Sequence, residues 1–336
     1  MGRFLLTFSL LFSSFTFCEA KTLKVFFIDV EGGQATLVVS PSGQTLLIDS
    51  GWSGFEGRDA KRIVAAAREA GVKRIDFMLV THYHGDHVGG VSQLAEKIPI
   101  GTFLDHGPSV ESGERPEALM AAYRSVVEKA RHKVVRPGDE IPIRGIDVKV
   151  LTAAGKAIQS PLAGPGQANP LCAETQRLDD GQGENPQSAG ILIQLGKFRM
   201  IDLGDLTWNK ELALVCPDNR VGKVNVYLTT HHANADSGSA AIVHALGPRV
   251  AVMNNGARKG GAPSAWRIIR DAPGLEDNWQ LHYSVEGGEE HNAPEQFIAN
   301  PGEMCEGRAV KLVAEEDGSF TVTNTRNGFS KRYNPR

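Results

Sequence analysis

Four side chains that can bind a metal ion lie within six consecutive positions of this chain, residues 82–87, which read His-Tyr-His-Gly-Asp-His. This segment follows an apolar, β-type run over residues 75–80. A loop at the end of a buried strand would turn several of these side chains toward one point. Neutral imidazoles and a carboxylate suit a borderline divalent cation, and zinc matches them best. The segment therefore predicts a metal centre rather than a solvated polar loop.

The same segment carries the HxHxDH signature of the metallo-β-lactamase superfamily, and other motifs follow in that family's order. Upstream, residues 27–35 and 46–51 together resemble the opening hairpin of the family. Downstream come an NxxS element at Asn185 and Ser188, a Gly-Asp element within residues 200–205, and paired histidines at the end of residues 227–232. Over about residues 23–256 the chain is similar to the soluble hydrolase domain of DNA-internalisation competence proteins. The resemblance implies an α/β fold, an αββα sandwich of two mixed β-sheets flanked by helices.

The resemblance also assigns metal ligands to positions of this sequence. It implies that His82 and His84 hold one ion, here called metal one. It implies that Asp86 and His87 hold a second ion, called metal two. Asp205, from the Gly-Asp element, would bridge the two ions or anchor one of them.

The remaining candidates lie later in the chain. Of the paired histidines, His232 aligns best with the family's ligand and is the predicted further ligand of metal two. His231 would either fix the orientation of a ligand without binding the ion, or be a packing or surface residue. The superfamily usually supplies a third histidine to metal one before the Gly-Asp element, where this chain has Asn185 and Ser188. The competence-type domains show the same gap. We expect metal one, with an amide oxygen or water in that position, to bind more weakly. His106 follows a predicted strand and could face the same cleft.

These ligands predict a hydrolase. A bound divalent ion lowers the pKa of its water toward neutrality, and Asp86 would orient that water and accept its proton. The same chemistry serves phosphodiesters, lactams, lactones and thioesters, so the resemblance implies a metal-dependent hydrolase, with phosphodiesters slightly favoured. The alternatives are a β-lactamase or lactonase on the same metal core, and a non-catalytic binding module that the metal stabilises.

The charge of the chain gives little support to nucleic acid as a partner. The formal net charge is −3, so the whole chain does not attract nucleic acid or anionic lipid. A local cationic stretch from Arg258 to Arg270 could meet a phosphate, although such stretches more often form a solvated surface. The chain also lacks the His-Gly-Ser and His-Pro elements of the competence-type proteins, which weakens the case for a nuclease. A small-molecule or phosphodiester substrate remains the expected partner.

The first twenty residues resemble a secretory signal peptide. Arg3 gives a short positive region, residues 4–17 are apolar, and a small-x-small site precedes Lys21. The apolar run is too short to span a bilayer comfortably, so we expect no transmembrane segment in the mature chain. The prediction is export, to a periplasm or to the outside, after removal of residues 1–20.

Three cysteines would remain after this cleavage, Cys172, Cys216 and Cys305. At most one disulfide can form among them within the chain, and the sequence does not choose the pair. An exported compartment would permit such a bond. None of the three has zinc-site spacing to another cysteine, so we interpret them as structural or incidental.

Residues 21–336 are expected to form a single metallo-β-lactamase-like domain, and 41% hydrophobic residues are ordinary for a globular protein. Residues 153–187 are rich in Gly, Pro, Asn and Asp and predict an insertion loop, which either borders the active site or has no role. A C-terminal extension is expected from about residue 257. The patterns also predict helices at 58–70, 91–97, 115–131 and 238–246, and a final hairpin of 309–313 and 319–325.

Overall fold

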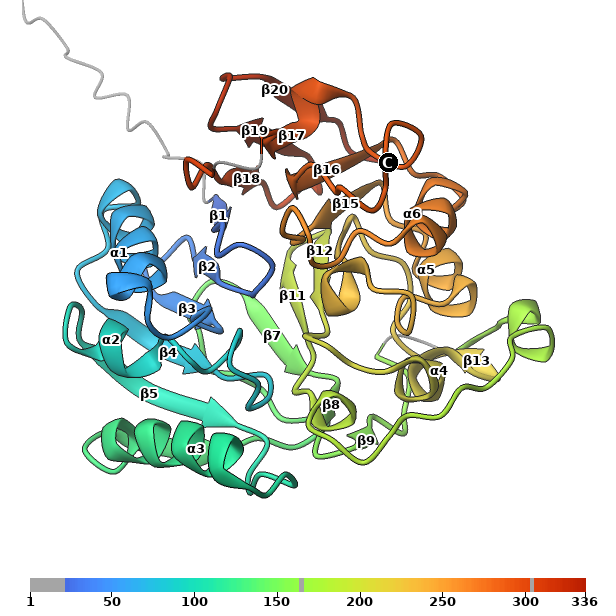
Figure 1. The fold of residues 1–336 in the computed structure, drawn as a ribbon. Coiled ribbons are helices and arrows are strands. Elements are labelled where there is room, and N and C mark those ends of the chain that lie inside the picture. Colours follow the sequence, from blue (N-terminus) through green and yellow to red (C-terminus); the bar gives the residue numbers. More distant parts are fainter. Residues whose placement is uncertain (1–21, 163–165, 303–304) are drawn as a thin grey trace, which may run out of the picture.

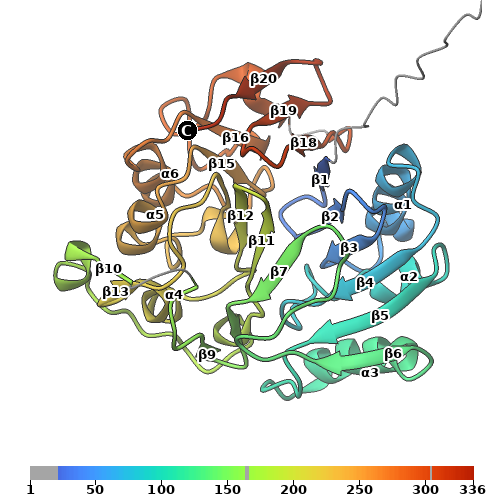
Figure 2. The ribbon, with the colours of Figure 1, turned by 180° about the vertical axis from the view of Figure 1, so that it is seen from behind.

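Two large β-sheets lie face to face, with helices on their outer sides, in the computed structural model, which describes residues 22–162, 166–302 and 305–336 (Figure 1, Figure 2). The first sheet has nine strands in the order β20-β19-β18-β1-β2-β3-β4-β5-β6. Its strands are β1 (Leu23–Phe27), β2 (Thr36–Val39), β3 (Thr45–Ile48), β4 (Ile75–Leu79), β5 (Ile100–Asp105), β6 (Arg131–Val134), β18 (Val310–Ala314), β19 (Phe320–Asn324) and β20 (Ser330–Tyr333). Helices α1 (Arg58–Glu69), α2 (Val91–Ala95) and α3 (Glu114–Val127) cover its outer face.

The second sheet has seven strands in the order β17-β16-β15-β14-β12-β11-β7. Its strands are β7 (Asp147–Val150), β11 (Ile191–Leu195), β12 (Phe198–Asp202), β14 (Val226–Leu228), β15 (Val250–Met253), β16 (Asp277–His282) and β17 (Ile298–Asn300). Helices α4 (Trp208–Val215), α5 (Ala240–Leu246) and α6 (Pro263–Arg270) lie on its outer side. The predicted fold class, two mixed sheets flanked by helices, is thus confirmed.

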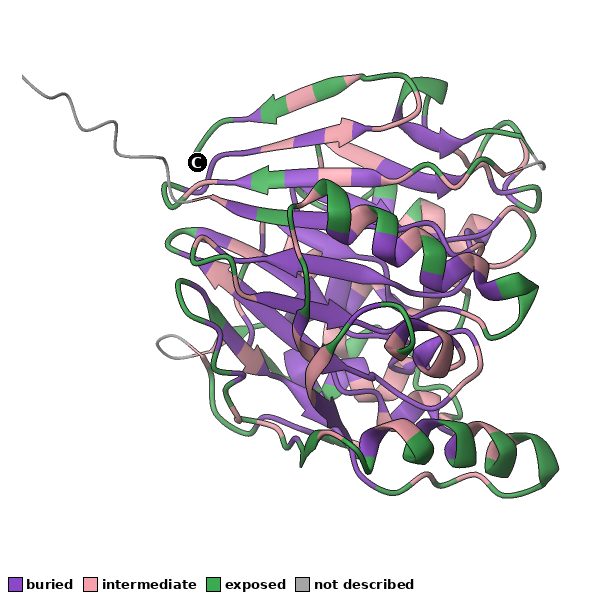
Figure 3. Ribbon diagram, turned by 90° about the vertical axis from the view of Figure 1, so that its left-hand side faces the viewer, coloured by how far each residue is buried: buried purple, intermediate pink, exposed green. Residues whose placement is uncertain are grey.

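Alternation along the strands divides the apolar core into three layers. In β1, Val25 and Phe27 pack between the two sheets, whereas Phe26 belongs to the layer under α1. In β12, Met200 faces the other sheet and Ile201 packs with the residues of α5. Successive strand side chains point to opposite faces, so strands with apolar residues at both parities must be covered on both sides. Figure 3 shows these buried strands and the exposed outer faces of the helices.

The predicted helices and the final hairpin are found, with two differences. The helix expected over 115–131 ends at Val127, and residues 131–134 form β6. Helices α4 and α6 had not been predicted. In α6, Arg267 and Arg270 alternate with buried Ala265 and Ile269, so the cationic stretch that suggested a phosphate contact is partly the outer face of an amphipathic helix.

Residues after 257 contribute to both sheets. They supply β16 and β17 to one and β18 to β20 to the other, and β18 pairs with β1 along its whole length. The hairpin of β18 and β19 is antiparallel, as predicted.

The stretch over residues 153–187 contains only short elements. Those in or at the edge of the stretch are β8 (Thr152–Ala153), β9 (Lys156–Ala157), β10 (Gln167–Ala168) and the 3-10 turns Pro170–Ala173 and Asn185–Gln187. The short elements elsewhere are β13 (Asp218–Asn219) and the 3-10 turns Phe55–Gly57, Thr230–Ala233 and Glu295–Phe297. A disulfide between Cys172 and Cys216 ties this stretch to the end of α4, and Cys305 is free. The sequence had left this pairing open.

Residues 1–20, the predicted signal peptide, lie outside the described residues. Among the helices that the structure does describe, none combines the length and the apolar character needed to span a lipid bilayer.

Candidate metal centre

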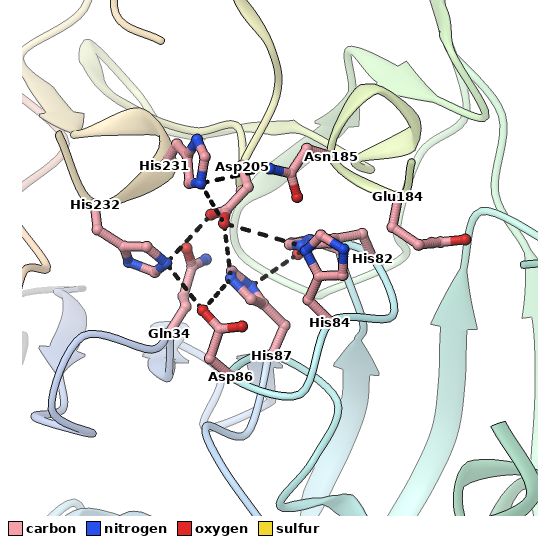
Figure 4. Close-up of polar contacts among 12 residues, drawn as sticks. Gln34, His82, His84, Asp86, His87, Glu184, Asn185, Asp205, His231 and His232 are labelled. Carbon is pink, nitrogen blue, oxygen red and sulfur yellow. Dashed lines mark hydrogen bonds and ion pairs between the residues drawn. The ribbon is translucent and has the colours of Figure 1, made fainter. Parts of the chain in front are cut away.

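Three loops that follow strand ends meet between the two sheets. Residues 81–87 follow β4, residues 203–205 follow β12, and residues 229–232 follow β14. These strands are apolar and buried, whereas the loops carry histidines and carboxylates. The fold therefore gathers polar side chains from distant parts of the sequence at one edge of the sandwich, where Figure 4 shows them pointing toward one another.

Four of the predicted ligands form a tight, buried cluster, which we call the Asp205 cluster. One ligand atom from each of Asp86, His87, Asp205 and His232 lies within 4.8 Å of the others. The Nε2 atom of His232 is 3.3 Å from Oδ2 of Asp86 and 3.4 Å from Oδ1 of Asp205. The Nε2 atom of His87 is 3.2 Å from Oδ2 of Asp205. This set includes all the predicted protein ligands of metal two.

Several atoms that face this cluster are buried and make no hydrogen bond within the described part of the chain. They are Nε2 of His82, His87 and His232, and Oδ1 of Asp205. Most buried polar atoms in proteins have a hydrogen-bond partner, so converging atoms without one need an explanation. Imidazole nitrogens and carboxylate oxygens are the ligands that zinc and similar ions take. The donor set fits a metal ion, and a metal-binding site is present here.

The second ring nitrogen, Nδ1, of His87 and of His232 contacts an oxygen atom outside the cluster. Nδ1 of His87 lies 2.7 Å from Oδ2 of Asp49, and Nδ1 of His232 lies 3.2 Å from the carbonyl oxygen of Asn254. Both acceptors require a proton on Nδ1, which leaves the lone pair of Nε2 directed at the cluster. Such partners fix the orientation of metal-binding histidines and raise their basicity. Sequence analysis did not identify Asp49 and Asn254 as partners of the histidines, because each follows a different strand from the histidine that it contacts.

The ligands expected for metal one are less closely gathered. His82 is completely buried, and its Nε2 atom is 3.9 Å from Oδ2 of Asp205. His84 has a side chain 34% exposed, and its Nε2 atom contacts Oε1 of Glu111 at 3.1 Å. Its ring centroid lies 4.7 Å from that of His82. The pair is therefore adjacent to the cluster, but only His82 faces Asp205.

Three further candidates occupy different places around the cluster. The Nε2 atom of His231 is 3.5 Å from Oδ2 of Asp205 and 3.4 Å from Nδ2 of Asn185. Ser188 is buried and its Oγ has no partner among the described residues. His106 turns away from the cluster and contacts Glu184 through Nε2, at 2.9 Å.

Glu184 is a residue that sequence reasoning missed. Its buried carboxylate accepts hydrogen bonds from the backbone N–H groups of Tyr83 and Val110, at 3.2 and 2.7 Å, in addition to the contact with His106. It thereby joins the ligand loop to the loop after β5. A signal existed, because this acidic residue directly precedes Asn185 of the NxxS element, at the end of the stretch proposed to border the site.

Electrostatics in the metal-free protein keep the carboxylates ionised. Burial alone would raise the pKa of Asp86, but His87, His232 and Lys259 hold it well below its usual value. Burial opposes ionisation of Asp205 too, and the same two histidines hold its pKa well below normal. Lys259 forms an ion pair with Asp86. Two ionised carboxylates in a buried cluster are what a divalent cation would neutralise.

The cluster opens into a cavity of about 410 Å³. Its walls include Trp52, His84, Arg115 and Lys259, while Asp205 lies at its polar end. The ammonium group of Lys259 lies 5.0 Å from the centre of the Trp52 ring. Two cationic side chains therefore stand beside the cluster, where an anionic group of a substrate could be bound.

Comparisons with known proteins agree with these observations. The model of the metallo-beta-lactamase superfamily matches residues 28–158. A hydroxyacylglutathione hydrolase of Idiomarina loihiensis is 36% identical over 90 residues, which cover 27% of this chain and 28% of that protein. A ribonuclease Z of Methanopyrus kandleri is 32% identical over 185 residues, which cover 50% of this chain and 60% of that protein. The chain therefore spans less than two thirds of the length of these relatives.

Among solved structures, the metallo-beta-lactamase fold protein YhfI from Bacillus subtilis aligns with a TM-score of 0.47 and 12% identity, over 77% of this chain and 96% of that one. The architecture described above, two large mixed sheets with flanking helices, matches a metallo-β-lactamase fold.

Proposed function

From the superfamily membership that the family model supports, we propose that this chain is an exported, zinc-dependent hydrolase. The observation that carries the proposal is the Asp205 cluster. Nε2 of His87 and His232 and Oδ1 of Asp205 are buried without a hydrogen-bond partner among the described residues, and the cluster lies beside an open cavity. A purely structural cluster would pair these atoms with one another or with the backbone.

The residues have distinct roles in this proposal. A divalent ion, when bound, supplies a water of lowered pKa. Asp86 orients this water and accepts its proton, for which its low pKa keeps it ionised at neutral pH. Asp205 would hold the two halves of the centre together, because Oδ1 faces His232 and Oδ2 faces both His87 and His82. Asp49 and Asn254 keep the imidazoles in the tautomer that presents Nε2.

Phosphodiesters are the favoured substrate class. Arg115 and Lys259 line the cavity, and cationic side chains bind phosphate oxygens through charge-assisted hydrogen bonds. The similarity to a ribonuclease Z supports the same class. The net charge of −3 argues for a small phosphodiester over a long nucleic acid, since affinity for nucleic acid depends largely on neutralising many phosphates.

Acyl compounds are the second candidate class. Several relatives are hydroxyacylglutathione hydrolases, and their matches cover about a third of this chain or less. The same water and the same cavity cations would serve an anionic thioester, lactam or lactone. A third hypothesis, a non-catalytic binding module, keeps the metal but predicts no hydrolysis of any of these compounds.

A parallel assay separates these possibilities. Zinc-loaded wild type and Asp86→Asn would be compared on a phosphodiester reporter, a chromogenic lactam and an acyl thioester. Asp271→Asn, at an exposed aspartate directly after α6, is the matched control. We expect phosphodiester hydrolysis that Asp86→Asn lowers by about 10²- to 10⁴-fold and Asp271→Asn leaves unchanged. Equal rates for wild type and Asp86→Asn on every substrate would refute the hydrolase.

Export and zinc are parts of the proposal that need their own tests. The signal-like residues 1–20 and the bond between Cys172 and Cys216 support an oxidising, exported location. Deleting residues 2–20 should keep the protein inside the cell, and secretion of the deleted chain would contradict export. The nitrogen and oxygen donors support zinc, and metal analysis of protein purified without added metal would identify the ion.

A further inference from the structure

His231 has the geometry of a metal ligand, although its sequence position suggested only an orienting or packing role. Its Nδ1 atom is 2.8 Å from Oδ1 of Asp236, and its Nε2 atom is 3.5 Å from Oδ2 of Asp205. His87 has similar neighbours, since its Nδ1 is hydrogen-bonded to Asp49 and its Nε2 faces Asp205, whereas the contact of His231 with Asp236 has the distance of an ion pair without hydrogen-bond geometry. A carboxylate behind a histidine is a usual partner of a metal-bound ring.

The backbone that presents His231 is unusual. His231, His232 and Ala233 have φ values of 50°, 55° and 62°, so three consecutive residues with a Cβ atom lie in the left-handed region. This region is disfavoured for such residues, and a run of them persists only where the surrounding structure imposes it. The turn directs two neighbouring rings at the same carboxylate, as Figure 4 shows.

The two rings approach different oxygens of Asp205. His232 faces Oδ1, at 3.4 Å, and belongs to the set of metal two. His231 faces Oδ2, at 3.5 Å, and His82 faces that same oxygen from 3.9 Å. An ion held by Oδ2 would therefore have the imidazoles of His82 and His231 beside it, together with that of His87, whose Nε2 lies 3.2 Å from the same oxygen.

We propose that His231 is the third imidazole ligand of metal one. This inference rests on the proposed metal centre and supplies the missing ligand of metal one, the ion expected to bind more weakly. The histidine that the superfamily usually places before the Gly-Asp element would here come from the turn after β14, so metal one would have His82, His84, His231 and Asp205. No amide oxygen or water is then required in the vacant sequence position.

Asn185, the residue that occupies that position, has a supporting place in this arrangement. Its Nδ2 atom lies 3.4 Å from Nε2 of His231, and Oδ1 of Asp236 lies 2.8 Å from Nδ1, so both side chains contact the ring. Nε2 has a single lone pair, so an ion bound there would replace the contact with Asn185. Asp236 and Asn185 are positioning residues for His231 in this proposal.

Metal titration of the full chain tests the assignment without any measurement of activity. His231→Asn removes the imidazole, and asparagine tolerates the left-handed backbone of the turn. His244→Asn is the matched control, because His244 lies on α5 and contacts only the carbonyl oxygen of Ile268 through Nε2. Metal per chain would be measured after equilibrium dialysis against zinc, and the absorption spectrum of the cobalt-loaded protein would report the coordination of each ion.

We expect two ions in wild type and in His244→Asn, and only the more tightly bound one in His231→Asn, with loss of one of the two cobalt signals. Asp236→Asn should weaken the same ion by about 10- to 100-fold. The assignment is overturned if His231→Asn binds two ions as tightly as wild type, or if wild type saturates with a single ion. A wild type that binds two ions but hydrolyses nothing refutes the proposed hydrolase and leaves the assignment standing.

Discussion

Two clusters among the described residues have the composition of a metal site, and they differ in whether their ligand atoms have partners. One is the Asp205 cluster. The other, which we call the Asp29 cluster, consists of Asp29, His282 and Cys305, whose ligand atoms also lie within 4.8 Å of one another. It lies between the ends of β1 and β16 and the loop before β18. Composition alone would rank a Cys-His-Asp group as a good zinc site.

In the Asp29 cluster the facing atoms already have partners. Oδ1 of Asp29 accepts from Nε2 of His282 at 2.7 Å and from the backbone of Glu31 at 2.8 Å. Oδ2 accepts from Arg62 at 3.0 Å and from the thiol of Cys305 at 2.6 Å. Protons and a guanidinium thus occupy the places that a cation would take. The metal centre therefore differs from the Asp29 cluster in its unpartnered inward-facing atoms rather than in residue types, although Nδ1 of His282 also has no hydrogen-bond partner among the described residues.

The largest expected effect is on metal binding. Asp205→Asn should lower zinc affinity by more than about 100-fold. Loss of a residue that only hydrogen-bonds to a metal ligand already lowers affinity by about 10- to 100-fold, and loss of a ligand shared by two ions should lower it further. Asp29→Ala should leave the zinc content unchanged. Metal analysis after dialysis measures both. Zinc loss in Asp29→Ala with retention in Asp205→Asn would reverse the interpretation of the two clusters.

The next effect concerns stability without metal. Asp29→Ala should lower the free energy of unfolding of the metal-free protein by about 3–5 kcal/mol, because it leaves His282 and the thiol of Cys305 without their acceptor and half-buried Arg62 with Glu31 alone. Asp205→Asn should cost less, because the loss of the attraction between Asp205 and His87 and His232 is partly offset by relief of the repulsion between two buried carboxylates. Urea denaturation of both variants in a chelator measures the difference. Equal losses would show that the Asp205 cluster also holds the metal-free fold together.

Zinc should stabilise only through the Asp205 cluster. At about 100 times the dissociation constant, a ligand that binds the folded state alone adds roughly 2.7 kcal/mol to the free energy of unfolding. We expect this gain in wild type and in Asp29→Ala, and none in Asp205→Asn. Thermal unfolding with and without zinc provides the test, and an undiminished gain in Asp205→Asn would place the ion elsewhere.

The smallest effect is expected at Cys305. Burial and the neighbouring Asp29 raise the pKa of this thiol to about 12, so at pH 8 it keeps its proton and donates it to the carboxylate. Cys305→Ser preserves a donor and should change the free energy of unfolding by about 1 kcal/mol or less. Alkylation of the native thiol by iodoacetamide at pH 8 should be slow and should accelerate as the pH rises, because the thiolate is the reactive form. Fast alkylation at pH 8 would indicate a thiolate and reopen the question of a cation there.

The sequence predicted the fold and much of the site because both depend on local patterns. The run over 75–80 and the HxHxDH element lie together in the chain, and the structure places His82 and Asp86 at the end of β4 as expected. The partners of the ligands could not be predicted in this way. Asp49 and Asn254 meet His87 and His232 only after the sheets have formed, and no spacing in the sequence encodes such contacts.

The role of His231 shows the same limit more sharply. Adjacent residues in an extended strand point to opposite faces, so paired histidines at a strand end suggest one ligand and one residue directed elsewhere. The left-handed turn at 231–233 cancels this alternation and directs both rings at Asp205. Residues 231–233 include no glycine or asparagine, the residues that usually indicate a left-handed turn, so the sequence pattern did not predict it.

The pairing of β1 with β18 has a consequence for how the chain matures. The first strand cannot acquire its outer neighbour until nearly the whole polypeptide has left the ribosome, so closure of the nine-stranded sheet waits for the last residues to be made. Contacts so distant along the chain also slow folding. Until then β1 has β2 as its only neighbour in the sheet.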